Sequence, residues 1–263
     1  MIGAIIGDIV GSIYEFDNIK TKDFELFDKE CVFTDDTVLT VAVADALMQF
    51  EEITDYEEFK SLLINIMHKY GKLYPDCGFG GHFLVWVLKK HTEPYNSFGN
   101  GSAMRVSPVG WYARTLEEAE NLAKATAEIT HNHPEGIKGA VVTAGSIFLA
   151  RTGATKEEIR NYVTQHYEIN FTLDEIRPDY NYDITCQGTV PQAMVAFFES
   201  EDFEDAIRNA ISIGGDSDTL AAITGSVAEA FYGIDEEMKE TALSYLDDEL
   251  LDVTEKFKKL YLI

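Results

Sequence analysis

The segment FTDDTVLTVAVADAL, residues 33–47, places two adjacent carboxylates, Asp35 and Asp36, between Thr34 and Thr37 at the start of an apolar stretch. The alanine- and valine-rich stretch predicts a buried helix. Threonine and aspartate at a helix start commonly accept hydrogen bonds from the free backbone N–H groups, so capping is one explanation of the cluster. Capping needs fewer side-chain oxygens than this segment supplies, and the surplus leaves cation binding open as a second explanation.

Composition limits the classes of protein to consider. The chain has 263 residues, of which 46% are apolar, so it can bury a large core. Its 46 acidic and 21 basic residues give a formal net charge of −25. Such a chain would be repelled by a phosphate backbone, which argues against general nucleic-acid binding. The acidic residues are spread along the chain and mostly indicate solvated helix faces.

The sequence predicts a cytoplasmic protein without a membrane span. It contains no run of about 18 apolar residues. The apolar N-terminus, MIGAIIGDIVGSIY, has no basic region before it and is interrupted by Asp8, so it does not resemble a signal peptide. Cys31, Cys77 and Cys186 are widely spaced and form no CxxC pair, which favours reduced thiols over disulfides or a zinc site.

Helical periodicity dominates the chain. In FEDAIRNAISIGG, residues 203–215, apolar residues recur at the spacing of one helix face before two glycines end it. Thr115 and Glu118 have the spacing of a capping box. The best strand candidate is the short segment NFTLDEI, residues 170–176. We therefore expect one all-α domain over residues 1–263. Further helices are expected near residues 56–70, 115–130, 134–150, 156–167, 190–199, 219–232 and 236–258.

Irregular segments rich in glycine, proline and asparagine interrupt these helices. Loops held by a rigid helical frame are where ligand contacts tend to occur. The segments are residues 17–33, 74–81, 91–102 and 178–190.

A second acidic cluster lies far downstream. In IGGDSDTLAAITG, Asp216, Asp218 and Thr219 precede another helix of small residues. If the two helix starts meet, four carboxylates would repel one another unless a cation lies between them. Carboxylate and hydroxyl oxygens are hard ligands, which favour Mg²⁺, Mn²⁺ or Ca²⁺ over zinc. The two clusters together therefore predict a divalent-metal site.

The N-terminal segment GDIVGSIYEF offers two more acids. Asp8 and Glu15 are seven residues apart and would share one face of a helix, with Gly11 between them. Small residues on that face are expected to make room for a ligand or a metal-bound water. For Asp8 itself, a capping or buried hydrogen-bonded role is favoured over a role as a ligand.

Five motifs in this order, GDIVGSIYE, FTDDT, GNGSAMRVSPVG, THNHPEG and GGDSDT, closely resemble the ADP-ribosylglycohydrolase family over roughly residues 2–232. The resemblance implies orthogonally packed helices around a cleft with two Mg²⁺ ions, for which Mn²⁺ is a plausible substitute. It also implies an enzyme that removes ADP-ribose from modified arginine or serine, or cleaves related ADP-ribosyl conjugates. The group that carries ADP-ribose is not specified by these motifs.

The resemblance assigns residues to the metals and to the chemistry. Glu15 matches an acidic position beside the metals and the reacting ribose. A carboxylate of Glu15, Asp35 or Asp36 would handle the proton on the water or the leaving group, and which of them does so stays open. The matched metal-binding positions are Thr34, Asp35, Asp36, Asp216, Asp218 and Thr219.

The glycine-rich segments DCGFGGHF and FGNGSAMR suit an ADP-ribose cleft, because residues without Cβ atoms let a diphosphate approach backbone N–H groups. Phe79 is expected to stack on a base or ribose, and Ser102 to lie where a helix N-terminus favours anions. By resemblance, His131 contacts the phosphates or the distal ribose, whereas His133 is expected to cap or support its loop. The substrate-binding residues are thus Gly78, Phe79, Gly80, Gly101, Ser102, Met104 and His131.

Three hypotheses follow for the function. The first is a hydrolase of ADP-ribosylated proteins or small-molecule conjugates that acts as a monomer. The second is a catalytically silent module that binds ADP-ribose or a nucleotide and regulates another process. The third is a helical protein stabilised by structural Ca²⁺. Loss of metal ligands would mark a silent descendant, and the presence of all six matched positions favours the hydrolase.

Overall fold

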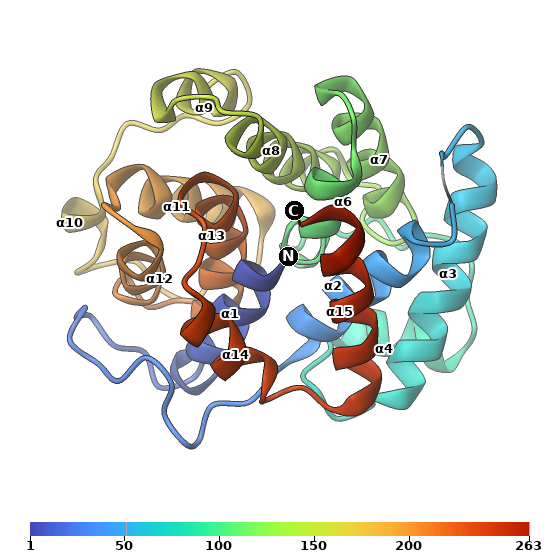
Figure 1. Cartoon of the computed structure of the whole chain (residues 1–263), viewed down its shortest axis with the longest axis horizontal. Helices are drawn as coiled ribbons and strands as arrows, with labels where there is room; N and C mark the ends of the chain where they lie inside the picture. The colour runs from blue at the N-terminus through green and yellow to red at the C-terminus, as the bar shows by residue number, and fades with distance from the viewer. Residues whose placement is uncertain (51, 263) are drawn as a thin grey trace.

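The computed structural model describes residues 1–50 and 52–262 (Figure 1). Residues 51 and 263, which belong to the expected domain, lie outside the described residues. Within the described part, the chain forms one all-helical domain without β-strands. An isolated antiparallel bridge joins Gly99 to Thr185. The predicted all-α fold is confirmed.

The helices are connected by loops of very different length, the longest of which follows the first helix. Their bounds are α1 (Ile2–Gly11), the 3₁₀ turn η1 (Ser12–Tyr14), α2 (Asp35–Leu47), α3 (Tyr56–Leu73), α4 (Gly81–Leu88), α5 (Gly101–Met104), α6 (Ser107–Tyr112), α7 (Leu116–Glu128), α8 (Pro134–Arg151), α9 (Lys156–Val163), α10 (Leu173–Ile176), α11 (Cys186–Glu199), α12 (Phe203–Ile211), α13 (Ser217–Tyr232), α14 (Glu236–Leu243) and α15 (Asp248–Tyr261).

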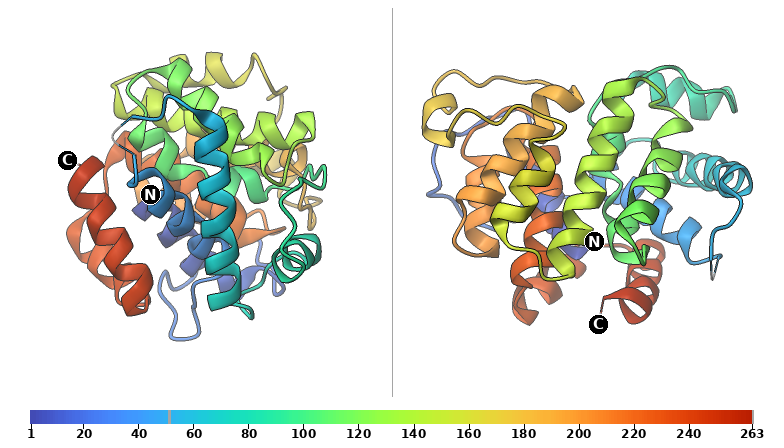
Figure 2. Two further views of the ribbon diagram at one scale, coloured as in Figure 1. Left: turned by 90° about the vertical axis from the view of Figure 1, so that its right-hand side faces the viewer. Right: turned by 90° about the horizontal axis from the view of Figure 1, so that it is seen from above.

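The helices form two groups around the middle of the molecule. Helices α1, α11, α12 and α13 pack together on one side, and α2, α3, α4 and α15 lie on the other (Figure 1). Helix α8 contacts α11 and α13 of the first group as well as α5, α6 and α7, and it runs between the two groups when the molecule is seen from above (Figure 2, right). Helices α1, α2 and α13, which carry acids of the motifs, contact one another.

Glycines on α1 let its backbone touch that of α13. A Cβ built at Gly7 would lie 2.1 Å from the carbonyl oxygen of Ala221, and one at Gly11 would lie 2.4 Å from the Cα atom of Asp218. The expectation that Gly11 makes room for a ligand is therefore wrong, because the space is filled by α13. The close approach instead brings α1 to the acidic start of α13.

Residues 170–176, the best strand candidate in the sequence, do not form a strand. Thr172 and Glu175 form a capping box in which each side chain accepts a hydrogen bond from the other residue's backbone, and α10 begins there. Local capping thus overrides the weak strand pattern of this segment.

Two further details of the helix prediction need correction. The segment 236–258 forms two helices, because the side chain of Asp247 accepts from Leu250 N–H and opens α15. At α7, Thr115 accepts from Glu118 N–H as expected (3.1 Å). The Glu118 carboxylate, however, accepts from the N–H of Arg114 (2.6 Å), so the box is only half formed.

The predictions about cysteines and membranes agree with the structure. Cys31, Cys77 and Cys186 are all free thiols. Among the described helices, none combines the length and apolar character needed to cross a membrane.

Candidate metal centre and substrate cleft

The start of α2 is capped by residues other than the two central carboxylates. Asp8, which is completely buried, accepts from the N–H groups of Thr34 (2.9 Å) and Thr37 (3.0 Å), and from the Thr34 hydroxyl (2.6 Å). Thr34 in turn accepts from Asp36 N–H (3.3 Å). The expected hydrogen-bonded role of Asp8 is confirmed. The carboxylates of Asp35 and Asp36 are released from capping.

Asp36 has an unpaired oxygen in the interior of the protein. Its side chain is 3% exposed, and its Oδ2 atom accepts from the hydroxyl of Thr219 on α13 (3.2 Å). The Oδ1 atom is buried and has no hydrogen-bond partner among the described residues. A buried carboxylate oxygen without a partner is costly, and a bound cation would satisfy it.

The start of α13 is built differently. Gly214 and Gly215 have positive φ angles of 68° and 82°, a conformation that glycine adopts readily. Asp216 follows at the N-cap position but makes no side-chain capping bond. Its Oδ2 atom accepts instead from the side-chain amide of Asn100, at 2.6 Å. Asn100 lies within the GNGSAMR segment but was not among the residues predicted from the sequence.

The acids from the separate segments meet in two overlapping groups. Carboxylate oxygens of Asp8, Asp36 and Asp218 lie within 4.8 Å of one another, and so do those of Glu15, Asp216 and Asp218. Asp218 belongs to both groups. The donor atoms are oxygens, the kind that Mg²⁺, Mn²⁺ and Ca²⁺ prefer. These buried acidic groups are consistent with a metal site.

Burial and mutual repulsion favour protonation of the central acids. Burial raises the pKa values of Asp35, Asp36 and Asp218 well above the usual range, and the neighbouring carboxylates raise them further. A bound divalent cation would act in the opposite direction by favouring the charged carboxylates. The cluster is therefore electrostatically unfavourable at neutral pH unless cations bind.

Glu15 is a distinct member of the cluster. It follows η1, beyond the end of α1, so it does not share a continuous helix with Asp8. Burial raises the pKa of Glu15 to about 7, and the nearby Asp216 carboxylate contributes to the increase. The hydroxyl of Tyr182 donates to the Glu15 carboxylate (3.1 Å) and partly offsets this effect.

A cleft of about 270 Å³ opens above these acids. Most of the residues predicted from the sequence line it, although they come from six separate segments. They are Glu15, Asp35, Asp36, Gly78, Gly80, Gly101, Met104, His131, Asp216, Asp218 and Thr219. The structure therefore brings together the predicted metal-binding acids and most of the predicted substrate-binding residues.

Three predicted residues do not line this cleft. Thr34 lies behind the acids, bonded to Asp8. The ring of Phe79 packs against Phe83 at 5.0 Å between centroids and is 9% exposed. The hydroxyl of Ser102 is buried and donates to the carbonyl oxygen of Gly136 (2.7 Å). The side chains of Phe79 and Ser102 thus have packing partners of their own.

His131 lies at the wall of the cleft as a neutral side chain. Burial lowers its pKa well below the usual range, and the nearby Arg105 guanidinium lowers it further. Its Nδ1 atom hydrogen-bonds with the Thr130 hydroxyl (2.8 Å). His133 has the supporting role expected for it: it caps α8 by accepting from Glu135 N–H (3.1 Å).

The cleft also contains residues that the sequence analysis did not select. Arg105 is completely buried and donates to the Thr130 hydroxyl (2.8 Å), while its Nε and Nη1 atoms have no partner among the described residues. Tyr182 and Ile184 belong to the irregular segment 178–190, from which no site residue was predicted, and both line the cleft. Their only signal in the sequence was membership of an irregular, polar segment.

Comparison with known proteins identifies the family. A sequence model described as ADP-ribosylglycohydrolase matches residues 1–261. The chain belongs to the ADP-ribosylglycohydrolase family. Within that family it is 24% identical to human ADP-ribosylhydrolase ARH3 over 317 aligned positions, which cover 90% of this chain and 85% of the relative.

A bacterial relative and a solved structure agree with this assignment. The chain is 27% identical to ADP-ribosylarginine hydrolase Tri1 of Pseudomonas putida (strain GB-1), with 89% of this chain and 70% of the relative covered. A solved structure titled "ADP-ribosylglycohydrolase-related protein complex" superimposes with a TM-score of 0.66 at 21% identity, and covers 98% of this chain and 96% of the other. That likeness shows that the chain has the ADP-ribosylglycohydrolase fold.

Proposed function

We propose that the protein is a metal-dependent hydrolase that cleaves the glycosidic bond of ADP-ribosyl conjugates and releases ADP-ribose. The observation that carries this proposal is the meeting of carboxylates from two distant helix starts in one cleft, with the buried Oδ1 atom of Asp36 left unpaired. Family membership supports the class of substrate.

Two Mg²⁺ ions, or Mn²⁺ in their place, are the cofactors that we propose. The ions would be held by Asp35, Asp36, Asp216, Asp218 and Thr219, with the Thr34 hydroxyl behind these ligands. When bound, such ions supply Lewis acidity and a template for the hydroxyl groups of the reacting ribose. The contribution of the chain is a fixed set of oxygen ligands in a largely buried site.

Glu15 is the carboxylate that we favour for proton transfer. It is half-buried, and its carboxylate lies within 4.8 Å of those of Asp216 and Asp218, where it would exchange a proton with a water at the proposed metal site. In the reaction, water forms a bond to the anomeric carbon while the bond to the leaving group breaks. Glu15 would accept the proton of the water, the leaving group would take up a proton from solvent, and Glu15 would then return its proton to solvent. Asp35 and Asp36 remain the other candidates for this role.

The rest of the cleft would bind ADP-ribose. A Cβ built at Gly80 would meet no atom within 4 Å, so open space lies beside this residue, whereas one at Gly101 would lie 3.1 Å from the Nε2 atom of His131. We propose that Gly78, Gly80 and Gly101 let the diphosphate approach, and that Met104 and His131 contact the ligand. Phe79 and Ser102 would contribute through their backbone, since their side chains are otherwise packed.

The substrate would be an ADP-ribosylated protein or a small-molecule conjugate. The name of the Pseudomonas relative makes arginine conjugates the first to test. We further propose that the chain works as one monomeric domain, residues 1–263, and in the cytoplasm, since its three free thiols suit a reducing compartment.

The test is release of free ADP-ribose from defined arginine, serine and acetyl-ester conjugates, with Mg²⁺ or Mn²⁺ and with EDTA. We expect release from at least one conjugate with metal and nearly complete loss with EDTA. Asp218→Asn provides the matched inactive variant. Binding of ADP-ribose without release from any conjugate would instead support the silent binding module.

A further inference from the structure

Asn18 connects the backbone at Glu15 to the turn that carries Asp216. Its side-chain amide nitrogen donates to the carbonyl oxygens of Tyr14 (2.7 Å), Glu15 (3.0 Å) and Gly215 (2.8 Å). Its side-chain oxygen accepts from Gly215 N–H, at 2.7 Å. One exposed side chain therefore hydrogen-bonds both to the backbone of residues 14–15 and to the backbone of Gly215, which lies 197 residues further along the chain.

The partner of Asn18 is a turn that depends on unusual backbone geometry. Gly214 and Gly215 both have positive φ angles, and Asp216 follows directly. Asn18 pairs with the N–H and the C=O of Gly215, as a second peptide group would. A Cβ built at Gly214 would lie 3.1 Å from the Oδ1 atom of Asn18, so the side chain is packed closely on the turn.

The residues around Asn18 are anchored to the same part of the protein. We call residues 16–24 the strap. Lys20 donates to the carbonyl oxygens of Tyr180 (2.6 Å) and Ile213. Further along the strap, Lys22 forms an ion pair with Asp205 on α12.

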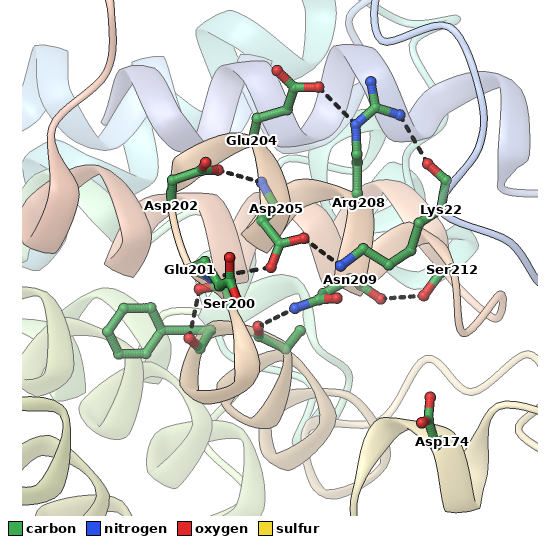
Figure 3. Close-up of polar contacts among 12 residues, drawn as sticks. Lys22, Asp174, Ser200, Glu201, Asp202, Glu204, Asp205, Arg208, Asn209 and Ser212 are labelled. Atoms are coloured by element: carbon green, nitrogen blue, oxygen red, sulfur yellow. Dashed lines mark hydrogen bonds and ion pairs between the residues drawn. The ribbon is translucent and has the colours of Figure 1, made fainter.

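The far end of the strap is held by α12 as well. Arg208 donates to the carbonyl oxygens of Lys22 (2.9 Å) and Phe24 (2.8 Å), and the contact with Lys22 is drawn in Figure 3 beside the ion pair of Lys22 with Asp205. These anchors hold the strap at its far end. Asn18 contacts the backbone of Glu15 itself, so it is the anchor closest to the reacting carboxylate.

We propose that Asn18 is a positioning residue that fixes Glu15 relative to Asp216 and Asp218. The inference rests on the proposed function, because it assumes that Glu15 transfers a proton beside metal ions held by those aspartates. The carboxylate of Glu15 has one hydrogen bond among the described residues, from Tyr182, which is itself 50% exposed. Its position therefore depends on how its backbone is held. A displacement of about 1 Å in such a group can cost about 100-fold in rate.

The test compares Asn18→Ala and Asn18→Leu with the wild type. Leucine keeps nearly the size of asparagine without its hydrogen bonds, so agreement between the variants separates lost bonds from lost volume. Asn161→Ala is the matched control, since Asn161 is an exposed asparagine on α9 with no side-chain hydrogen bond among the described residues. The measurements are kcat and KM for the hydrolysed conjugate, Mn²⁺ affinity by calorimetry, and hydrogen exchange of the Gly215 amide.

We expect both Asn18 variants to lose about 10- to 100-fold in kcat with KM changed by less than about 3-fold, because alignment rather than substrate binding is lost. Mn²⁺ affinity should fall about 10-fold, the scale of a lost group behind a metal ligand. Exchange at Gly215 should accelerate, since its amide loses its acceptor. The Asn161→Ala variant should match the wild type in all three.

The results separate this inference from the proposed function. If the wild type hydrolyses no conjugate, the proposed function fails, while Mn²⁺ affinity and exchange at Gly215 still decide whether Asn18 holds the turn. If either Asn18 variant matches Asn161→Ala in Mn²⁺ affinity and in exchange at Gly215, the positioning role is contradicted.

Discussion

The starts of α2 and α13 both present acids to the cleft, but they free those acids in different ways. At α2, Asp8 on another helix accepts from the backbone N–H groups, so Asp35 and Asp36 need not cap their own helix. At α13, the N-cap residue Asp216 makes no capping bond and is held sideways by Asn100. The start of α2 is therefore capped by Thr34 and by Asp8 of another helix, whereas the N-cap residue of α13 makes no side-chain capping bond.

The surface helices show what an ordinary helix start does with such residues. Asp55, Thr155, Asp202 and Asp235 each accept a hydrogen bond from the first turn of the helix that they begin. In the cleft, Asp35 and Asp36 do not cap α2 and Asp216 does not cap α13, although Asp218 accepts from the N–H of Thr219 (2.9 Å). An acid at a helix start therefore indicates a ligand site when another residue caps the helix in its place, or when the acid itself makes no capping bond.

The largest effect is expected at Glu15, which lies beside the start of α13. Glu15→Gln keeps the shape of the side chain and removes its charge and basicity. We expect kcat to fall by about 10²–10⁴-fold, the usual effect of a lost general acid or base, with ADP-ribose binding nearly unchanged. Single-turnover kinetics and a binding titration check this. Weakened binding with an intact turnover rate would mean that Glu15 holds the ligand without transferring a proton.

The next largest effect is a loss of Mn²⁺ affinity that is expected at the start of α13. Asn100→Ala removes the amide that holds Asp216 at 2.6 Å. We expect Mn²⁺ affinity to fall about 10- to 100-fold, as for other groups that orient a metal ligand. The loss of metal-free stability should be smaller than for Asp8→Asn, because the Asn100 amide donates two side-chain hydrogen bonds, to Asp216 and Thr189, whereas Asp8 accepts three. Calorimetric titration and thermal unfolding in EDTA measure the two quantities. A destabilised variant with unchanged Mn²⁺ affinity would show that Asn100 is only structural.

At α2, Asp8→Asn should lower metal-free stability more than it lowers Mn²⁺ affinity. The N–H groups of Thr34 and Thr37 both donate to Oδ2, which the asparagine oxygen can replace. The Thr34 hydroxyl donates to Oδ1 at 2.6 Å, and there the amide nitrogen takes the place of the acceptor oxygen. We expect the free energy of unfolding in EDTA to fall by about 1–3 kcal/mol, because a buried donor loses its acceptor. Urea unfolding measures it. Equal loss of stability in Asp8→Asn and Asn100→Ala would remove the difference that we draw between the helix starts.

The dependence of stability on pH tests the electrostatics shared by both starts. The pKa values of Asp35, Asp36 and Asp218 are raised in the folded state, so the folded protein binds more protons than the unfolded one and loses stability as pH rises above about 4. The lowered pKa of His131 acts in the opposite direction as pH falls below about 6.5.

The Asp36→Asn variant separates the contribution of the acids to the pH dependence of stability from that of His131. In EDTA at pH 7.5, the unfolding temperature of Asp36→Asn should lie about 2–4 °C above that of the wild type for each 1 kcal/mol of repulsion relieved. At pH 5 this difference in unfolding temperature should be smaller. Saturating Mn²⁺ should reverse the order, since only the wild type keeps the ligand. A gap that does not vary with pH would show that repulsion at Asp36 is not relieved by the substitution.

Sequence patterns were informative where the interactions are local. Helix periodicity predicted most of the helices, and the surplus of oxygens at Asp35–Asp36 and Asp216–Asp218 predicted that these segments form a site. At residues 170–176, the best strand candidate, the deciding signal was also local: the capping box of Thr172 and Glu175 is present in the sequence but was not recognised there.

The parts that could not be predicted depend on contacts between distant segments. The bond from Asn100 to Asp216 joins residues 116 apart, and that from Tyr182 to Glu15 joins residues 167 apart. Nothing in the neighbourhood of either donor specifies its acceptor. The same holds for Gly11, whose missing side chain suggested room for a ligand until the packing of α13 against it was known.

The central claim is that the two helix starts form one metal centre. Calorimetric titration of Mn²⁺ into the wild type, Asp36→Asn, Asp218→Asn and the double variant tests it most directly. Because residues that share a site are not additive, each single substitution should remove most of the Mn²⁺ binding, and the double variant should lose little more. Losses that simply add, with an intact site left in each single variant, would contradict the claim, as would a wild type that binds no Mn²⁺ at millimolar concentration.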